Sequence, residues 1–149
     1  MYTLLLTIHL LGTLVWVGGM FFAHMAMRQA AHELLDPPLR LPFLKRVLDL
    51  FFRWVWLSIA AIMVSGYWIF LLLFQGEAGL YVHLMQGLGL VMTGLFCFVY
   101  FVPYRRMGLA LEQKDIPAAA TQMAMIRKVI GVNLILGLVT TIIAVSKYI

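Results

Sequence analysis

Four long stretches of this 149-residue sequence contain no Asp, Glu, Lys or Arg. They hold 27, 23, 27 and 18 residues, and they cover residues 1–27, 54–76, 78–104 and 129–146. A transmembrane α-helix needs about 20 predominantly apolar residues. Only 11% of all residues are charged, against roughly 25% in soluble domains. These stretches therefore predict an all-α integral membrane protein, a bundle of four transmembrane helices.

The basic residues are concentrated in two of the intervening segments. Of the 11 Lys and Arg residues, five lie within 28–53, five lie within 105–128, and the last is Lys147. Short loops rich in Lys and Arg stay on the cytoplasmic side of a membrane. Both termini are therefore expected on the outer side. This topology also accounts for the net charge of +5, so no nucleic-acid partner is expected.

The patterning gives approximate helix boundaries within a single transmembrane domain, residues 1–149. The four helices are expected at about 2–30, 41–74, 80–104 and 116–147. Residues 41–53 alternate apolar and charged side chains at helical spacing, so an amphipathic helix is expected at the inner interface, continuing into the second span. A loop with three prolines is expected around 37–42, and a short turn at 75–79.

Two histidines lie within the apolar runs, where an ionisable side chain needs a partner. If the first helix enters the bilayer near residue 3, His9 lies about 9 Å along its axis, and His83 lies about 6 Å into the third helix. The two helices run in the same direction, so both imidazoles are expected at similar depth. They could be axial ligands of a shared haem b, ligands of another metal ion, or donors to neighbouring carbonyls. Trp16 follows His9 on nearly the same face, where it would flank a ring-shaped ligand or pack in the core.

A second candidate metal site lies at the inner end of the first helix. Met20, His24 and Met27 have i, i+4, i+7 spacing, which places them along one face of an α-helix. Soft thioethers suit Cu(I), so the three residues are candidate copper ligands. Methionine is also an ordinary filler of apolar cores, and this explanation stays open.

The first helix combines His9 with the pattern Trp16-x-Gly18, and this opening resembles that of the CopD-like (copper resistance D) family of bacterial inner-membrane proteins. It also resembles the related small-membrane-protein type of protoporphyrinogen oxidase. The similarity continues at residues 52–54, 65–68, 81–87 and 102–106. The resemblance implies a multi-helix bundle in the bacterial inner membrane, associated with copper handling or b-type haem. It adds weight to His9 and His83 as haem-side residues.

The function expected from the sequence is that of a b-type haem-binding membrane protein, acting in electron transfer or a redox step linked to copper or haem metabolism. One alternative is a copper-binding or transport protein without haem, using either the methionine–histidine cluster or the two outer histidines. Another is a cofactor-free assembly partner. The expected partners are the lipid bilayer and a redox partner or quinone, and a homo-oligomer is left open.

Enzymatic activity is left open as that of a membrane oxidoreductase. The oxidase family carries a Lys two residues after the position that matches His83, and this chain has Met85 there. The acidic signature of that family near its last helix is missing from residues 127–133. Protoporphyrinogen oxidase activity is therefore disfavoured. Both termini are expected in the periplasm.

Overall fold

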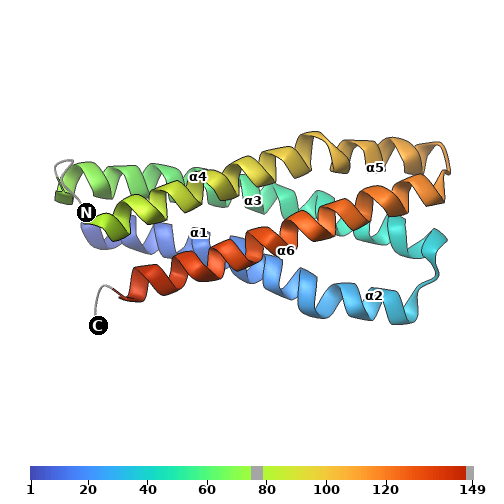
Figure 1. Cartoon of the computed structure of the whole chain (residues 1–149), viewed down its shortest axis with the longest axis horizontal. Helices are drawn as coiled ribbons and strands as arrows, with labels where there is room; N and C mark the ends of the chain where they lie inside the picture. Colours follow the sequence, from blue (N-terminus) through green and yellow to red (C-terminus); the bar gives the residue numbers. More distant parts are fainter. Residues whose placement is uncertain (75–78, 147–149) are drawn as a thin grey trace.

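The computed structural model describes residues 1–74 and 79–146, and Figure 1 shows them as an elongated bundle of helices. The elements in chain order are α1 (Tyr2–Phe22), a π-helical segment (Ala23–Met27), α2 (Arg28–Leu34), α3 (Pro37–Phe74), α4 (Leu80–Phe101), α5 (Pro103–Glu112) and α6 (Ile116–Ser146). Four helical spans, 2–34, 37–72, 80–112 and 116–146, are long and apolar enough to cross a membrane. The predicted all-α fold with four membrane-spanning helices is confirmed.

The two ends of the bundle are distinguished by the chain termini. The helix α1 begins and α6 ends at the same end (Figure 1), which we call the terminal end. The opposite end, which carries most of the Lys and Arg residues, is called the basic end. The expected turn at residues 75–78 and the cation Lys147 lie outside the described residues.

The connection between the first two spans is shorter than expected. The first span continues through the π-helical segment to Leu34, and only Leu35 and Asp36 separate it from α3. The expected proline-containing loop is wrong, because all three prolines lie within the first turns of α3. Pro37 and Pro38 are tolerated there, since the first four backbone N–H groups of a helix have no intrahelical acceptor, whereas Pro42 lies inside the helix and removes one backbone hydrogen bond. Residues 41–53 are the amphipathic first part of α3, continuous with the span.

A break at Val102 divides the third span. Proline lacks an N–H and its ring clashes with the carbonyl four residues earlier, so α4 ends just before Pro103 and α5 begins at it. The helical chain therefore continues past the expected end near residue 104. At the next turn, Lys114 has φ 57°. The Asp115 carboxylate then accepts a hydrogen bond from the Ala118 N–H at 3.0 Å, which caps the start of α6.

Glycines allow the helices to approach closely at two places. A Cβ at Gly12 would lie 3.2 Å from the Ser58 carbonyl oxygen, so α1 lies directly against the backbone of α3. A Cβ at Gly137 would lie 2.9 Å from Val17 Cγ2, which brings α6 against α1. Small residues at such contacts allow the van der Waals packing on which helix association in lipid depends.

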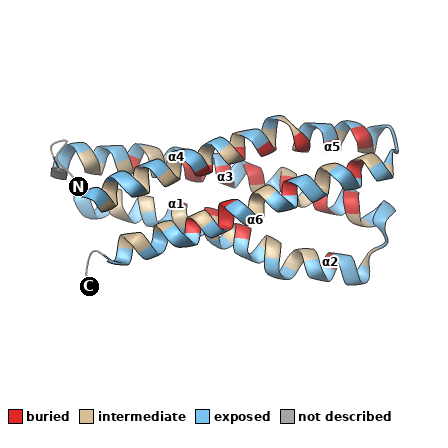
Figure 2. Cartoon of the chain, in the orientation of Figure 1, coloured by how far each residue is buried: buried red, intermediate tan, exposed pale blue. Residues whose placement is uncertain are grey.

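Buried side chains line the inside of the bundle, whereas its outside is largely apolar and exposed (Figure 2). The core includes Trp16, Met20, Phe52, Val55, Met92, Phe96, Val99, Met107, Ile126 and Leu134. Exposed Leu, Ile, Val and Phe side chains occur on all the long helices. An outward apolar surface on four spans of this length is the surface that contacts a lipid bilayer.

Candidate functional site

His9 lies on α1 near the terminal end, and its ring is turned toward α3. Its Nδ1 lies 3.2 Å from the Ile62 carbonyl oxygen and 3.1 Å from Ser65 Oγ. Gly66 provides space for the ring, because a Cβ at that position would lie 3.0 Å from His9 Cε1. The half-buried imidazole is therefore held at the interface between α1 and α3.

These contacts determine which ring nitrogen carries the proton. A carbonyl oxygen only accepts hydrogen bonds, so the His9 Nδ1–H donates to Ile62. The Ser65 hydroxyl donates to the Ala61 carbonyl at 2.5 Å, which leaves its oxygen able to accept from the same Nδ1–H. The unprotonated nitrogen of the neutral ring is then Nε2. A metal-binding histidine is typically oriented in this way, with its other nitrogen bound to a carbonyl.

His83 lies in the first turn of α4, and its ring also meets α3. The residue is exposed, and its ring centroid lies 5.9 Å from that of Phe70 in an edge-to-face arrangement. Phe70 follows Gly66 by four residues, or about 6 Å along a helix. The structure therefore brings both histidines to α3 at the terminal end, about one helical turn apart along it. A ligand shared directly between His9 and His83 stays a prediction.

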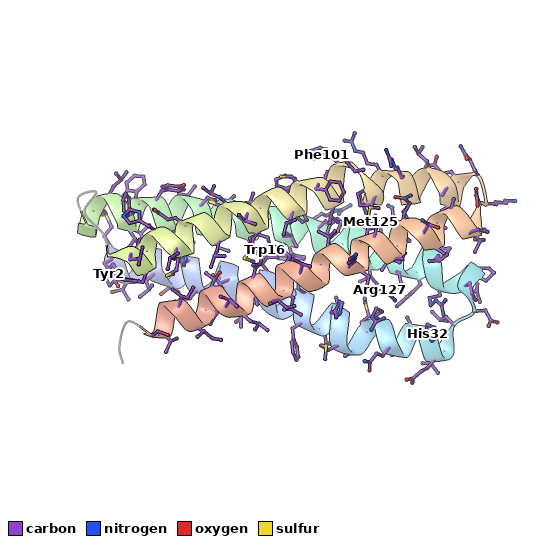
Figure 3. The ribbon with its side chains drawn as sticks, viewed as in Figure 1. Tyr2, Trp16, His32, Phe101, Met125 and Arg127 are labelled. Atoms are coloured by element: carbon purple, nitrogen blue, oxygen red, sulfur yellow. The ribbon has the colours of Figure 1, made fainter. Side chains whose placement is uncertain are left out.

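Trp16 is buried in the middle of the bundle (Figure 3). Its ring meets Phe96 of α4 edge to face, with centroids 6.4 Å apart. It lines a cavity of about 10 Å³ together with Met20 and Asn133. The Asn133 amide donates to the Met92 carbonyl at 3.3 Å, while its buried Oδ1 has no hydrogen-bond partner among the described residues. The contacts of Trp16 are those of a core side chain.

The π-helical segment interrupts the methionine–histidine cluster. Met20 is buried on α1, whereas His24 and Met27 lie within the π-helical segment and are half-buried. The i→i+5 hydrogen bonds of a π-helix change the register, so the α-helical spacing on which this cluster was based does not hold through residues 23–27. The three residues stay a predicted ligand set. His24 lies against α6, where a Cβ at Gly131 would lie 3.3 Å from its Cε1.

No set of three or more His, Cys, Asp or Glu within residues 1–74 and 79–146 is arranged to hold a metal ion. His32 is exposed on α2 near the basic end (Figure 3), far along the chain axis from His9.

A larger pocket lies near the basic end, between α3, α4 and α5. Its volume is about 360 Å³, and it is lined by Lys45, Arg46, Asp49, Phe52, Arg53, Trp56, Tyr100 and Tyr104. We call it the basic-end pocket. This pocket was not predicted from the sequence, although its lining residues on α3 recur at helical spacing. The signal that could have found it is this stripe of charges and aromatic rings, paired with two tyrosines on the next span.

A polar network forms one wall of the basic-end pocket. The Asp49 carboxylate accepts hydrogen bonds from Lys45 Nζ at 2.5 Å and from the Tyr104 hydroxyl. The ammonium of Lys45 also lies 4.2 Å from the centroid of the Tyr104 ring. The Asp49 carboxylate thus accepts hydrogen bonds from two donors. Arg46 and Arg53 are exposed, and the structure shows neither in an ion pair within the described part of the chain.

Four apolar spans, close helix contacts and an apolar outer surface define a multi-pass membrane protein built as a helical bundle. The chain belongs to the copper resistance protein D family, whose model matches residues 45–147. The matched residues include His83 and the whole basic-end pocket, whereas His9 precedes them. No curated protein and no solved structure matches the chain.

Proposed function

We propose that this protein serves copper resistance by binding copper at the terminal end, through His9 and His83. The observation that carries the proposal is the Nδ1–H hydrogen bond of His9 to the Ile62 carbonyl, which leaves Nε2 as the free lone pair. Imidazole is a suitable ligand for copper. The exposed ring of His83 lies about one turn away along α3, and membership of the copper resistance protein D family supports copper as the metal.

The terminal site is favoured over the methionine–histidine cluster because of packing. The Met20 side chain is 2% exposed and forms part of the core, so its sulfur is surrounded by packed side chains. His24 is directed to Gly131 of α6. Copper binding by Met20, His24 and Met27 would require the core side of α1 to open, whereas His83 is already accessible.

The same proposal includes the orientation of the protein. Ten of the 11 Lys and Arg residues lie in the two segments at the basic end, and such segments stay in the cytoplasm. We place the basic end in the cytoplasm of a bacterium and both termini in the periplasm, in the inner membrane. Copper would then bind from the periplasmic side. A reporter enzyme fused near residue 110 should be cytoplasmic, and one fused at the C-terminus should be periplasmic.

Haem b, with a role in electron transfer, is the second candidate for the terminal end. The fixed tautomer of His9 suits an iron ligand as well as a copper ligand. A haem would also need a flat space between the two rings, and neither cavity described above includes His9 or His83. A redox partner or quinone is required only under this candidate.

The test is the copper content of purified protein after incubation with Cu(I) and desalting. We expect His9→Ala and His83→Ala each to lower the bound copper strongly, whereas His32→Ala should leave it unchanged. His32 is the matched control because it is an exposed histidine at the opposite end. Normal copper content in both terminal variants would contradict the proposal. An absorption spectrum of the same samples, oxidised and then reduced, would show sharp α and β bands if haem b were bound instead.

A further inference from the structure

The basic-end pocket lies at the depth of lipid headgroups. The uncharged part of α3, residues 54–74, is about 32 Å long, close to the roughly 30 Å thickness of a bilayer's hydrocarbon core. Arg53 immediately precedes it and therefore lies at the boundary. Lys45 lies about 12 Å further out. On the opposite wall, Tyr100 lies about 30 Å along α4 from Leu80, where that helix begins. Tyr100 is therefore also at the basic-end boundary of the hydrocarbon core, at the same depth as Arg53.

The lining of the pocket carries an excess of positive charge, with three cations and one carboxylate. Asp49 is already bound by Lys45 and by the Tyr104 hydroxyl. The remaining cations of the lining are Arg46 and Arg53, which lie seven residues apart on one face of α3. Guanidinium groups bind phosphate oxygens in a bidentate geometry, so a phosphate group complements this pair.

The other walls of the pocket are aromatic and continue onto the lipid-facing surface. Phe52, Trp56 and Tyr100 line it, and the Trp56 and Tyr100 rings meet edge to face with centroids 5.5 Å apart. Beside the pocket, Trp54 is 60% exposed and Phe101 is 51% exposed; Figure 3 shows Phe101 at the outer edge of the bundle. A ligand that fits has an anionic head and an apolar body.

We propose that the basic-end pocket is a binding site for the phosphate headgroup of an anionic lipid. Arg46 and Arg53 bind the phosphate oxygens, and the acyl chains lie along the exposed aromatic surface beside Trp56. The depth of the pocket favours a lipid over a free phosphate. The aromatic surface beside the pocket continues into the bilayer, and only a lipid has an apolar body that can follow it. This site is separate from the copper proposal, and either can fail without the other.

The experiment is a titration of the detergent-purified protein with phosphatidylglycerol, in which native mass spectrometry counts the bound lipid. Phosphatidylcholine serves as the lipid of zero net charge. We expect Arg46→Gln with Arg53→Gln to weaken phosphatidylglycerol binding by about 30-fold, because each juxtamembrane cation contributes about a fivefold gain toward anionic lipid. The control is Arg40→Gln with Lys114→Gln, which removes the same charge from the same end, and Arg40 lies about 20 Å further along α3 from the boundary than Arg53. It should change the affinity by less than about threefold, because distant surface charges are screened.

Three results would overturn the proposal. Equal weakening in the two double variants would indicate a diffuse electrostatic effect. Equal affinity for phosphatidylglycerol and phosphatidylcholine would remove the role of charge. Displacement of the lipid by millimolar inorganic phosphate would identify a site for a free anion. Circular dichroism and thermal melting monitor the fold; if the double arginine variant is unfolded, Arg53→Gln alone replaces it, with an expected loss of about fivefold.

Discussion

The two ends of the bundle are held together in different ways. At the terminal end, α1 lies against the backbone of α3 at Gly12, and His9 occupies the space beside Gly66. At the basic end, α3 meets α4 and α5 through the Tyr104 hydroxyl, which donates a hydrogen bond to Asp49, and through aromatic rings around an open pocket. Close backbone packing thus fixes one imidazole at the terminal end. The looser, charged packing at the basic end leaves two guanidinium groups available to an anion.

The largest effect should come from separating α1 and α3. In Gly12→Leu, the new side chain would meet the Ser58 carbonyl, which belongs to a helix backbone and cannot move aside. We expect a loss of about 1–3 kcal/mol in the free energy of unfolding, measured by denaturant titration in micelles. Gly18→Leu is the control, because no atom lies within 4 Å of a Cβ there. Equal losses in the two variants would show that the close approach does not matter.

The next largest effect should come from removing the hydrogen bond between His9 Nδ1 and the Ser65 hydroxyl. Ser65→Ala removes one acceptor of the Nδ1–H and leaves the Ile62 carbonyl. Loss of such an outer partner typically lowers metal affinity by about 10–100-fold, and we expect the lower limit here, measured by competition with a copper chelator. Ser58→Ala is the control, a buried serine on the same helix. Unchanged copper affinity in Ser65→Ala would contradict a role of the Ser65 hydroxyl in orienting His9 as a ligand.

At the basic end, the tyrosine hydroxyl should contribute less. Tyr104→Phe removes the hydrogen bond to Asp49 but keeps the aromatic packing. A net hydrogen bond is worth about 0.5–1.5 kcal/mol, so we expect destabilisation in that range by thermal or chemical unfolding. Tyr67→Phe, an exposed tyrosine elsewhere on α3, should have almost no effect. A similar loss in both variants would contradict the network.

The smallest effect belongs to the ion pair. Lys45 and Asp49 are one helical turn apart and partly exposed, and such pairs typically contribute about 0.3–0.5 kcal/mol. A double-mutant cycle with Lys45→Gln and Asp49→Asn should give a coupling energy of this size, reduced by salt. A coupling energy above about 2 kcal/mol that persists in salt would show that the basic end is packed as tightly as the terminal end.

The four spans could be predicted from the sequence because uncharged runs of membrane length have few other solutions. The π-helical segment could not, since residues 23–27 carry no proline or other marker of a changed register. Pro37 and Pro38 suggested a loop because proline ends helices in their interior, yet it is tolerated in a first turn; Pro42 lies inside α3 without ending it. Their position relative to the helix start was the missing information.

The candidate site was predictable only as far as single helices allow. Spacing gave the depth of His9 and His83, yet it did not reveal that both rings meet α3, because neighbours in a bundle follow from three-dimensional packing. The basic-end pocket was missed for the same reason. In the sequence, the charges of Lys45 and Arg53 are fully accounted for as determinants of membrane topology. Only the structure shows that Tyr100 and Tyr104 line the same pocket.

The most direct test of the account is X-ray absorption spectroscopy of the copper-loaded protein, because it identifies the atoms bound to the metal. Copper held by His9 and His83 predicts imidazole nitrogen scatterers and no sulfur in the first shell, with the nitrogen signal lost in His9→Ala. A first shell containing thioether sulfur, unchanged in His9→Ala, would place copper at Met20, His24 and Met27 and contradict the assignment to the terminal end.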